Sequence, residues 1–149
     1  MIVFEAKNAS FDFARNINLF ITGAFYIAPA LHVWYCKLLP RIATKLFPNF
    51  SNTSMAFGKM AVDQLGFAPI LLSGFFPFVG MVNSRSLEGL KIGVGDIKTK
   101  LWDTLLANWK IWPLASTINF MLMPLKYQVL FANFVGLFWN MILSYIAYK

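Results

Sequence analysis

Long apolar segments, separated by short polar connections, run along almost the whole chain. A helix needs roughly 20 mostly apolar residues to cross the hydrocarbon core of a bilayer, which is about 30 Å thick. Prolines within the first two segments, Pro29, Pro69 and Pro77, are expected to bend them, because proline removes a backbone donor and clashes with the preceding turn. The pattern predicts an all-α fold in one membrane domain over residues 1–149, a bundle of three to four kinked transmembrane helices. The expected spans are residues 17–39, 54–82, 107–125 and 127–148.

The stretch 86–106 has a different pattern, in which apolar residues recur at steps of three and four between charged ones. Such spacing predicts an amphipathic helix with one apolar face, lying in the membrane interface or against a neighbouring protein. Gly89 and Gly93 form a small-xxx-small pair within it, a weak signal outside a strictly apolar span. The apolar positions are Leu87, Leu90, Val94, Ile97, Leu101 and Leu105.

A few residues are expected to mark helix ends. Ser54 or Thr53 is suited to cap the second span, because a hydroxyl oxygen accepts a hydrogen bond from the first turn. Pro113 is suited to the first turn of the third apolar helix, where its missing N–H costs nothing, and Pro124 to the end of that helix.

The composition agrees with a membrane location. Hydrophobic residues make up 58% of the chain and charged residues 13%, whereas a soluble domain carries about 25% charged residues. Aromatic residues reach 17%, and the pair Trp34–Tyr35 stands where an aromatic belt at the membrane interface is expected. The formal net charge is +7, from basic residues that are scattered rather than clustered. This favours anionic lipid as a partner and argues against nucleic acid.

The chain offers little catalytic chemistry. His32 and Cys36, the single residues of their kinds, are spaced i, i+4 and share a helix face. A cysteine–histidine nucleophile also needs an orienting group and an oxyanion site, and neither accompanies them. Zinc requires three or four such ligands. We therefore expect no enzyme, no metal site and no cofactor, apart from bound phospholipid such as cardiolipin.

Charged residues within the second span are the most informative candidates. Lys59 and Asp63 are spaced i, i+4 and are expected to pair, with Gln64 adjacent. Charges at membrane depth are costly and normally face protein or water. Two interpretations remain: the pair docks this helix against its neighbours near the interface, or the three residues line a solute path.

Amide and small residues form a second group, on the last two spans. Asn133, Asn140 and Ser144 fall at steps of seven and four, and Asn119 lies on the preceding span. Such residues let helices approach and hydrogen-bond each other. Helix packing and a hydrated channel wall are the two interpretations.

Spaced motifs in this sequence resemble the Mpv17/PMP22 family of integral membrane proteins. The first block is Gly23, Pro29, His32 and Trp34–Tyr35, and the second is Lys59, Asp63–Gln64 and Phe67-Ala68-Pro69. The third comprises Trp109, Trp112, Pro113, Asn119, Phe120, Pro124, Trp139, Asn140 and Ser144. The resemblance covers most of the chain, from Arg15 to Ser144. Family members usually carry one further helix ahead of the first block, and that helix is expected to be missing here.

The resemblance implies a protein of the mitochondrial inner membrane, with the peroxisomal membrane as the alternative. Two functions are compatible with it. The favoured hypothesis is a non-catalytic accessory subunit of a large respiratory-chain or ATP synthase assembly, with membrane lipids and other membrane subunits as partners. The alternative is a weakly selective channel or metabolite pathway of the family type, acting on its own, with Lys59, Asp63, Gln64 and Asn140 as its lining.

Overall fold

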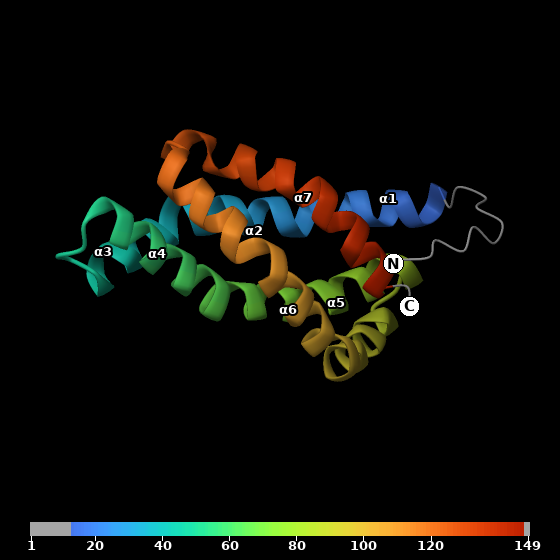
Figure 1. The fold of residues 1–149 in the computed structure, drawn as a ribbon. Helices are drawn as coiled ribbons and strands as arrows, with labels where there is room; N and C mark the ends of the chain where they lie inside the picture. The colour runs from blue at the N-terminus through green and yellow to red at the C-terminus, as the bar shows by residue number, and fades with distance from the viewer. Residues whose placement is uncertain (1–12, 148–149) are drawn as a thin grey trace.

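The computed structural model describes residues 13–147, and every regular element in that range is helical (Figure 1). The elements follow one another as four helical rods joined by three short turns. The first rod comprises α1 (Phe13–Thr22), η1 (Gly23–Ile27), α2 (Ala28–Val33), η2 (Trp34–Leu38) and α3 (Leu39–Leu46). The second comprises α4 (Asn52–Val62), η3 (Asp63–Phe67) and α5 (Ala68–Ser84), and the last two are α6 (Glu88–Leu122) and α7 (Leu125–Ala147). The predicted all-α fold class is confirmed.

The first two rods, Phe13–Leu46 and Asn52–Ser84, are long and apolar enough to cross a membrane. They run antiparallel on either side of the α3–α4 turn (Figure 1). They contain the expected spans 17–39 and 54–82. The expected spans 107–125 and 127–148 coincide with the second half of α6 and with α7, and their crossing of the bilayer stays a prediction.

Three π-helical turns, η1, η2 and η3, interrupt these rods, and each ends two residues before a proline. In each case the residue before the proline donates its backbone N–H to the first carbonyl of the π turn. A proline has no N–H to offer and its ring crowds the preceding turn, so the helix widens by one residue there. The disruption expected at Pro29 and Pro69 is therefore a π turn in each case. A third π turn precedes Pro40.

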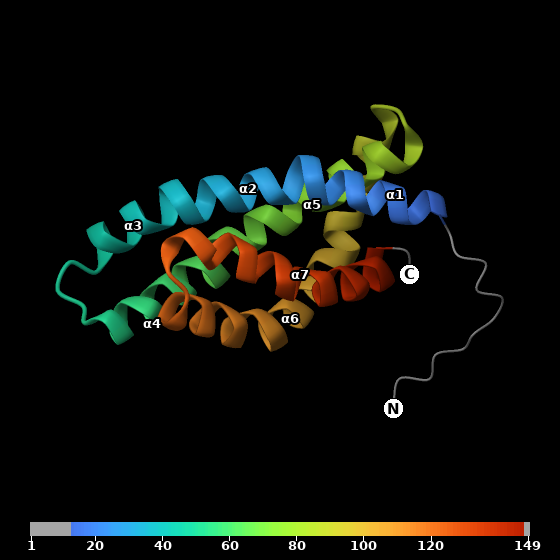
Figure 2. The ribbon, with the colours of Figure 1, turned by 90° about the horizontal axis from the view of Figure 1, so that it is seen from above.

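The expected amphipathic helix is not a separate element. The stretch 86–106 continues without a break into the third apolar segment, and together they form α6, which crosses the other helices obliquely (Figure 2). Pro113 lies inside α6 rather than in a first turn, so that prediction is wrong. Neighbouring groups in a bundle supply the hydrogen bonds that an internal proline displaces. Pro124 does follow the end of α6, as expected.

The cap of α4 also differs from the prediction. The N-cap is Ser51, whose hydroxyl oxygen accepts a hydrogen bond from the Ser54 backbone N–H at 3.3 Å. Thr53 and Ser54 lie within the first turn. The helix starts earlier than its apolar pattern indicates, because its first turn is polar.

Glycines bring α5 and α6 into backbone contact. A Cβ atom on Gly80 or Gly89 would overlap the carbonyl oxygen of the other residue, and a Cβ on Gly93 would overlap the backbone of Phe76 and Pro77. The Gly89–Gly93 pair, a weak signal in the sequence, is therefore the surface on which these two helices cross.

Two apolar clusters hold the rods together. One lies between α5, α6 and α7 and includes Phe75, Phe76 and Trp139. The other includes Leu31, Trp34 and Tyr35. The expectation that Trp34 and Tyr35 form an interfacial belt is wrong, because both are buried inside the bundle. The outer face is instead covered by exposed apolar side chains, as suits contact with lipid; they include Phe20, Phe25, Ile70, Leu114 and Tyr145.

Candidate functional site

Asp63 lies at the centre of a buried hydrogen-bond network. Its side chain is only 3% exposed. One carboxylate oxygen accepts a hydrogen bond from Trp34 Nε1 at 2.7 Å, and the other accepts from Gln64 Nε2 at 2.8 Å and from Ser116 Oγ at 3.2 Å. The carboxylate is thus held by donors from its own helix and from two others, which offsets part of the cost of removing it from water.

Gln64 extends this network toward α6. Its side-chain oxygen accepts a hydrogen bond from Asn108 Nδ2 at 2.7 Å, and its Nε2 also lies 3.3 Å from Ser116 Oγ. The backbone carbonyl of Gln64 accepts from Trp109 Nε1 at 3.1 Å. We call Trp34, Asp63, Gln64, Asn108 and Ser116 the polar cluster; all five side chains are buried.

The π turns place the polar cluster. Trp34 is the first residue of η2 and Asp63 the first of η3, so the two widened turns face each other across the bundle. The Trp34 indole also stacks on Phe67, the last residue of η3, with ring centroids 4.5 Å apart. Single π turns occur frequently at functional sites, where an extra residue redirects a side chain.

Lys59 does not pair with Asp63 in the described structure. The carboxylate of Asp63 faces Trp34, Gln64 and Ser116 instead. The π turn begins at Asp63. Lys59 lines a separate cleft beside Asn52 and Phe120. The expected i, i+4 ion pair is therefore wrong.

Asn119 joins the end of α6 to the start of α7. Its Nδ2 donates to the Gln128 carbonyl at 3.0 Å, and Gln128 Nε2 donates to the Met123 carbonyl at 3.2 Å. Asn119 Oδ1 and Trp112 Nε1 are buried without a hydrogen-bond partner among the described residues. Both belong to α6, seven residues apart and therefore on one face of it.

Asn133 and Asn140 point away from the other helices of this chain. Both side chains are exposed on α7, beside exposed Phe134, Leu137 and Met141. Neither amide packs α7 onto α6, whereas Asn119 does contact α7. Ser144 belongs to α7, but its side chain lies outside the described part of the structure.

Most of the family-signature residues pack between helices. Trp112 and Trp139 pack edge to face with centroids 6.4 Å apart, and Phe120 packs against the buried Tyr35 at 5.7 Å. Trp109 contacts the polar cluster through Gln64. Pro113 and Pro124 lie inside and just after α6, and Asn140 is exposed.

The sequence alone did not connect Trp34, Asn108 and Ser116 to Asp63. A faint signal was present, since Asn108, Trp112, Ser116 and Asn119 recur at steps of three and four and so share one face of α6. His32 and Cys36 are neighbours as expected, with Sγ 3.8 Å from Nδ1. No group of metal-ligating side chains was found among the described residues.

The fold and the polar cluster define a helical integral membrane protein whose apolar helices are joined by a buried polar network. Part of the chain, residues 86–144, matches the family model described as "Mpv17 / PMP22 family". The chain is 36% identical over 138 residues to "Protein SYM1" of Saccharomyces cerevisiae, covering 93% of this chain and 68% of that one. It is 32% identical to "PXMP2/4 family protein 2" of Dictyostelium discoideum over 145 residues, covering 97% of this chain and 70% of that one.

A third relative, "Mitochondrial inner membrane protein Mpv17" of Caenorhabditis briggsae, is 32% identical over 138 residues, covering 91% of this chain and 70% of that one. No solved structure matches the chain. The chain belongs to the Mpv17/PMP22 family, which confirms the resemblance seen in the sequence. Its location is the mitochondrial inner membrane.

Proposed function

We propose that this chain forms a weakly selective, non-catalytic solute pathway through the mitochondrial inner membrane, with the polar cluster as its closed constriction. The observation that supports the proposal is the buried carboxylate of Asp63, hydrogen-bonded to two other helices within an apolar span. An ionisable group inside a membrane span costs about 3 kcal/mol on insertion scales and marks ion or substrate pathways.

The arrangement of the polar cluster suits a constriction. Its side chains come from η2, η3 and α6, so a small separation of these helices would open a passage lined by a carboxylate and two amides. In the described state the helices are in contact and Asp63 and Gln64 are no more than 4% exposed. We therefore regard this state as closed.

The proposal predicts that Asp63→Asn changes selectivity without removing the pathway. Asparagine keeps the size of the side chain but removes its negative charge, so the preference for cations over anions should fall several-fold. The measurement is the reversal potential across a bilayer holding the purified chain, under a potassium chloride gradient.

Asp103→Asn is the matched control, because Asp103 is an exposed carboxylate on α6 outside the polar cluster. Thermal unfolding in detergent confirms that each variant is folded. A folded Asp63→Asn protein with unchanged selectivity, or a wild-type chain that conducts nothing, would contradict the proposal.

A second candidate function, an accessory subunit of a respiratory-chain or ATP synthase assembly, is favoured by Asn133 and Asn140. Their amides are exposed on a helix face that otherwise presents large apolar side chains. Amide groups facing lipid lack hydrogen-bond partners, and a helix from another subunit would supply them. Gentle extraction, native gel separation and mass spectrometry test this. Stoichiometric comigration with such a complex supports the subunit function, and migration alone or as a small homo-oligomer refutes it.

A further inference from the structure

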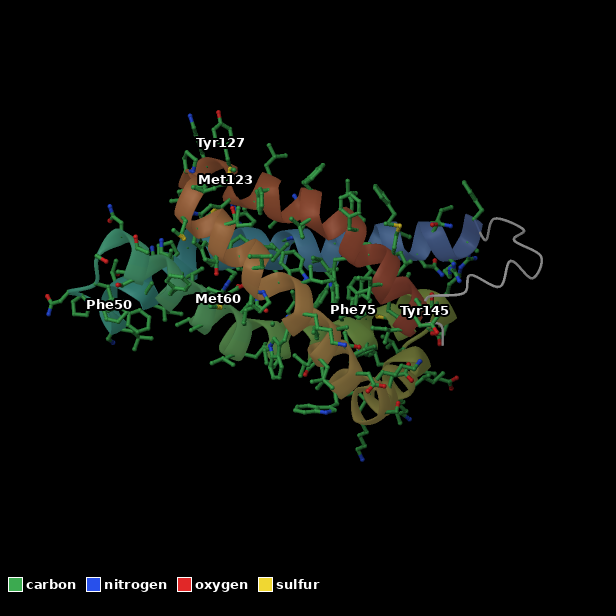
Figure 3. The ribbon with its side chains drawn as sticks, in the orientation of Figure 1. Phe50, Met60, Phe75, Met123, Tyr127 and Tyr145 are labelled. Carbon is green, nitrogen blue, oxygen red and sulfur yellow. The ribbon has the colours of Figure 1, made fainter. Side chains whose placement is uncertain are left out.

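A cleft of about 290 Å³ lies between the first turns of α4 and the last turns of α6. The α4 side contributes the polar residues Asn52, Thr53 and Lys59 together with Met55 and Ala56, and the α6 side is apolar, formed by Phe120 and Met121. Figure 3 shows Met60, next to Lys59 in sequence, and Met123, at the end of α6, in the half of the molecule opposite Tyr145. A cleft lined by a lysine, other polar groups and apolar side chains matches a ligand that has an anionic head and an apolar tail.

The charge around the cleft favours an anion. Residues 37–62 and 123–130 contain Lys37, Arg41, Lys45, Lys59 and Lys126 but no aspartate or glutamate. Asp63, the nearest carboxylate in sequence, is directed into the polar cluster and away from Lys59. The start of α4 adds the positive end of a helix dipole, which also favours negative charge.

The depth of the cleft in the membrane fits a lipid headgroup. The rod Asn52–Ser84 has 33 residues, and at a rise of about 1.5 Å per residue it is about 50 Å long. With the rod centred in the bilayer, Asn52 lies about 25 Å from the midplane and Lys59 about 14 Å from it. The edge of the hydrocarbon core is about 15 Å from the midplane, so the polar residues of the cleft cover the headgroup layer.

We propose that this cleft binds the phosphate group of an anionic glycerophospholipid. Lys59, with the amide of Asn52 and the hydroxyl of Thr53, contacts the phosphate oxygens, since ammonium, amide and hydroxyl groups all donate hydrogen bonds to them. The acyl chains lie along Met55, Phe120 and Met121 and continue over the exposed Leu122. A free phosphate ion would leave the apolar side chains of the cleft uncovered, which is why we assign the site to a lipid.

The test is native mass spectrometry of the purified, delipidated full chain with equal amounts of phosphatidylglycerol and phosphatidylcholine. Wild-type protein should retain phosphatidylglycerol preferentially, and Lys59→Gln should lower that preference about fivefold, the effect of one basic residue at an anionic surface. Met121→Trp, which fills the apolar side, should lower retention while leaving Lys59 in place. The matched control is Lys98→Gln, an exposed lysine on the first half of α6; it should retain the wild-type preference.

Thermal unfolding of each variant shows that it is folded. An unchanged lipid preference in folded Lys59→Gln protein, or an equal loss in Lys98→Gln, overturns the proposal. Inorganic phosphate provides the second arm: at concentrations equal to the lipid it should not displace phosphatidylglycerol. If it does, the cleft is a soluble-anion site and the lipid assignment is wrong. None of these readouts requires solute flux, so the outcome is independent of the proposed pathway.

Discussion

At the scale of single residues, the most consequential contact is the hydrogen bond from the Trp34 indole to Asp63. A buried carboxylate needs its donors, because an acceptor left without one retains the full cost of its desolvation. Trp34 supplies the shortest of the three side-chain hydrogen bonds to Asp63, at 2.7 Å, and it comes from a different rod. Neither residue type by itself reveals this pairing, since tryptophan near the end of a span more often indicates an interface.

Trp34→Phe tests that contact. Phenylalanine keeps an aromatic ring to stack on Phe67 but removes the N–H, so the free energy of unfolding should fall by about 1–3 kcal/mol. Unfolding in mixed micelles, followed by circular dichroism, measures the change. Trp102→Phe, on the exposed side of α6, is the control and should unfold like wild type. Equal stability of both variants would show that the Trp34 hydrogen bond contributes little.

At the scale of elements, the crossing of α5 and α6 depends on glycine. Gly93→Ala should destabilise the protein by about 1–3 kcal/mol, because the added methyl group meets the backbone of α5 and forces the helices apart. Gly95→Ala is the matched control two residues away, where a Cβ meets nothing within 4 Å. Alanine favours helix over glycine by about 1 kcal/mol, so Gly95→Ala should be neutral or stabilising in the same unfolding assay. A Gly93→Ala protein as stable as wild type would contradict the close crossing.

The helices themselves were largely predictable from the length of the apolar segments and the spacing of apolar residues. The continuity of α6 and the π turns within the first two rods were not predictable in this way. The fusion of 86–106 with the third apolar segment into α6 was missed because Pro113 was interpreted as a helix start. The π turns were missed because a proline in a sequence indicates some disruption without specifying its form. Those turns set which way Trp34 and Asp63 point. The predicted Lys59–Asp63 pair was therefore wrong, whereas the interpretation that Asp63 and Gln64 dock this helix against its neighbours followed from the cost of polar groups inside a span.

At the scale of the whole molecule, the first two rods are longer than the hydrocarbon core. Each is about 50 Å long at the rise of an α-helix, against about 30 Å of hydrocarbon. The α3–α4 turn, where Phe50 lies at one end of the molecule (Figure 3), should therefore project into water.

Cysteine labelling tests that placement. The labelling uses a Cys36→Ser background, so that the introduced cysteine is the single thiol. Phe50→Cys should react with a membrane-impermeant maleimide when the reagent has access to the side of the membrane that holds the α3–α4 turn, because Phe50 is 48% exposed. Ala132→Cys, at a buried position in the interior of α7, is the control and should stay unlabelled until the protein is unfolded. An unreactive Phe50→Cys in permeabilised mitoplasts would place the turn inside the bilayer.

The closed packing around Asp63 also bears on how well the membrane insulates. Separating the helices breaks about four hydrogen bonds at once, those that Trp34, Asn108, Trp109 and Ser116 donate to Asp63 and Gln64. At about 1 kcal/mol each, these bonds would hold the open state of the proposed pathway near one molecule in a thousand. An inner membrane holds a voltage worth about 2.3 kcal/mol per charge for every 100 mV. The proposed pathway, open so rarely, would exchange solutes slowly and leave that stored voltage almost undiminished.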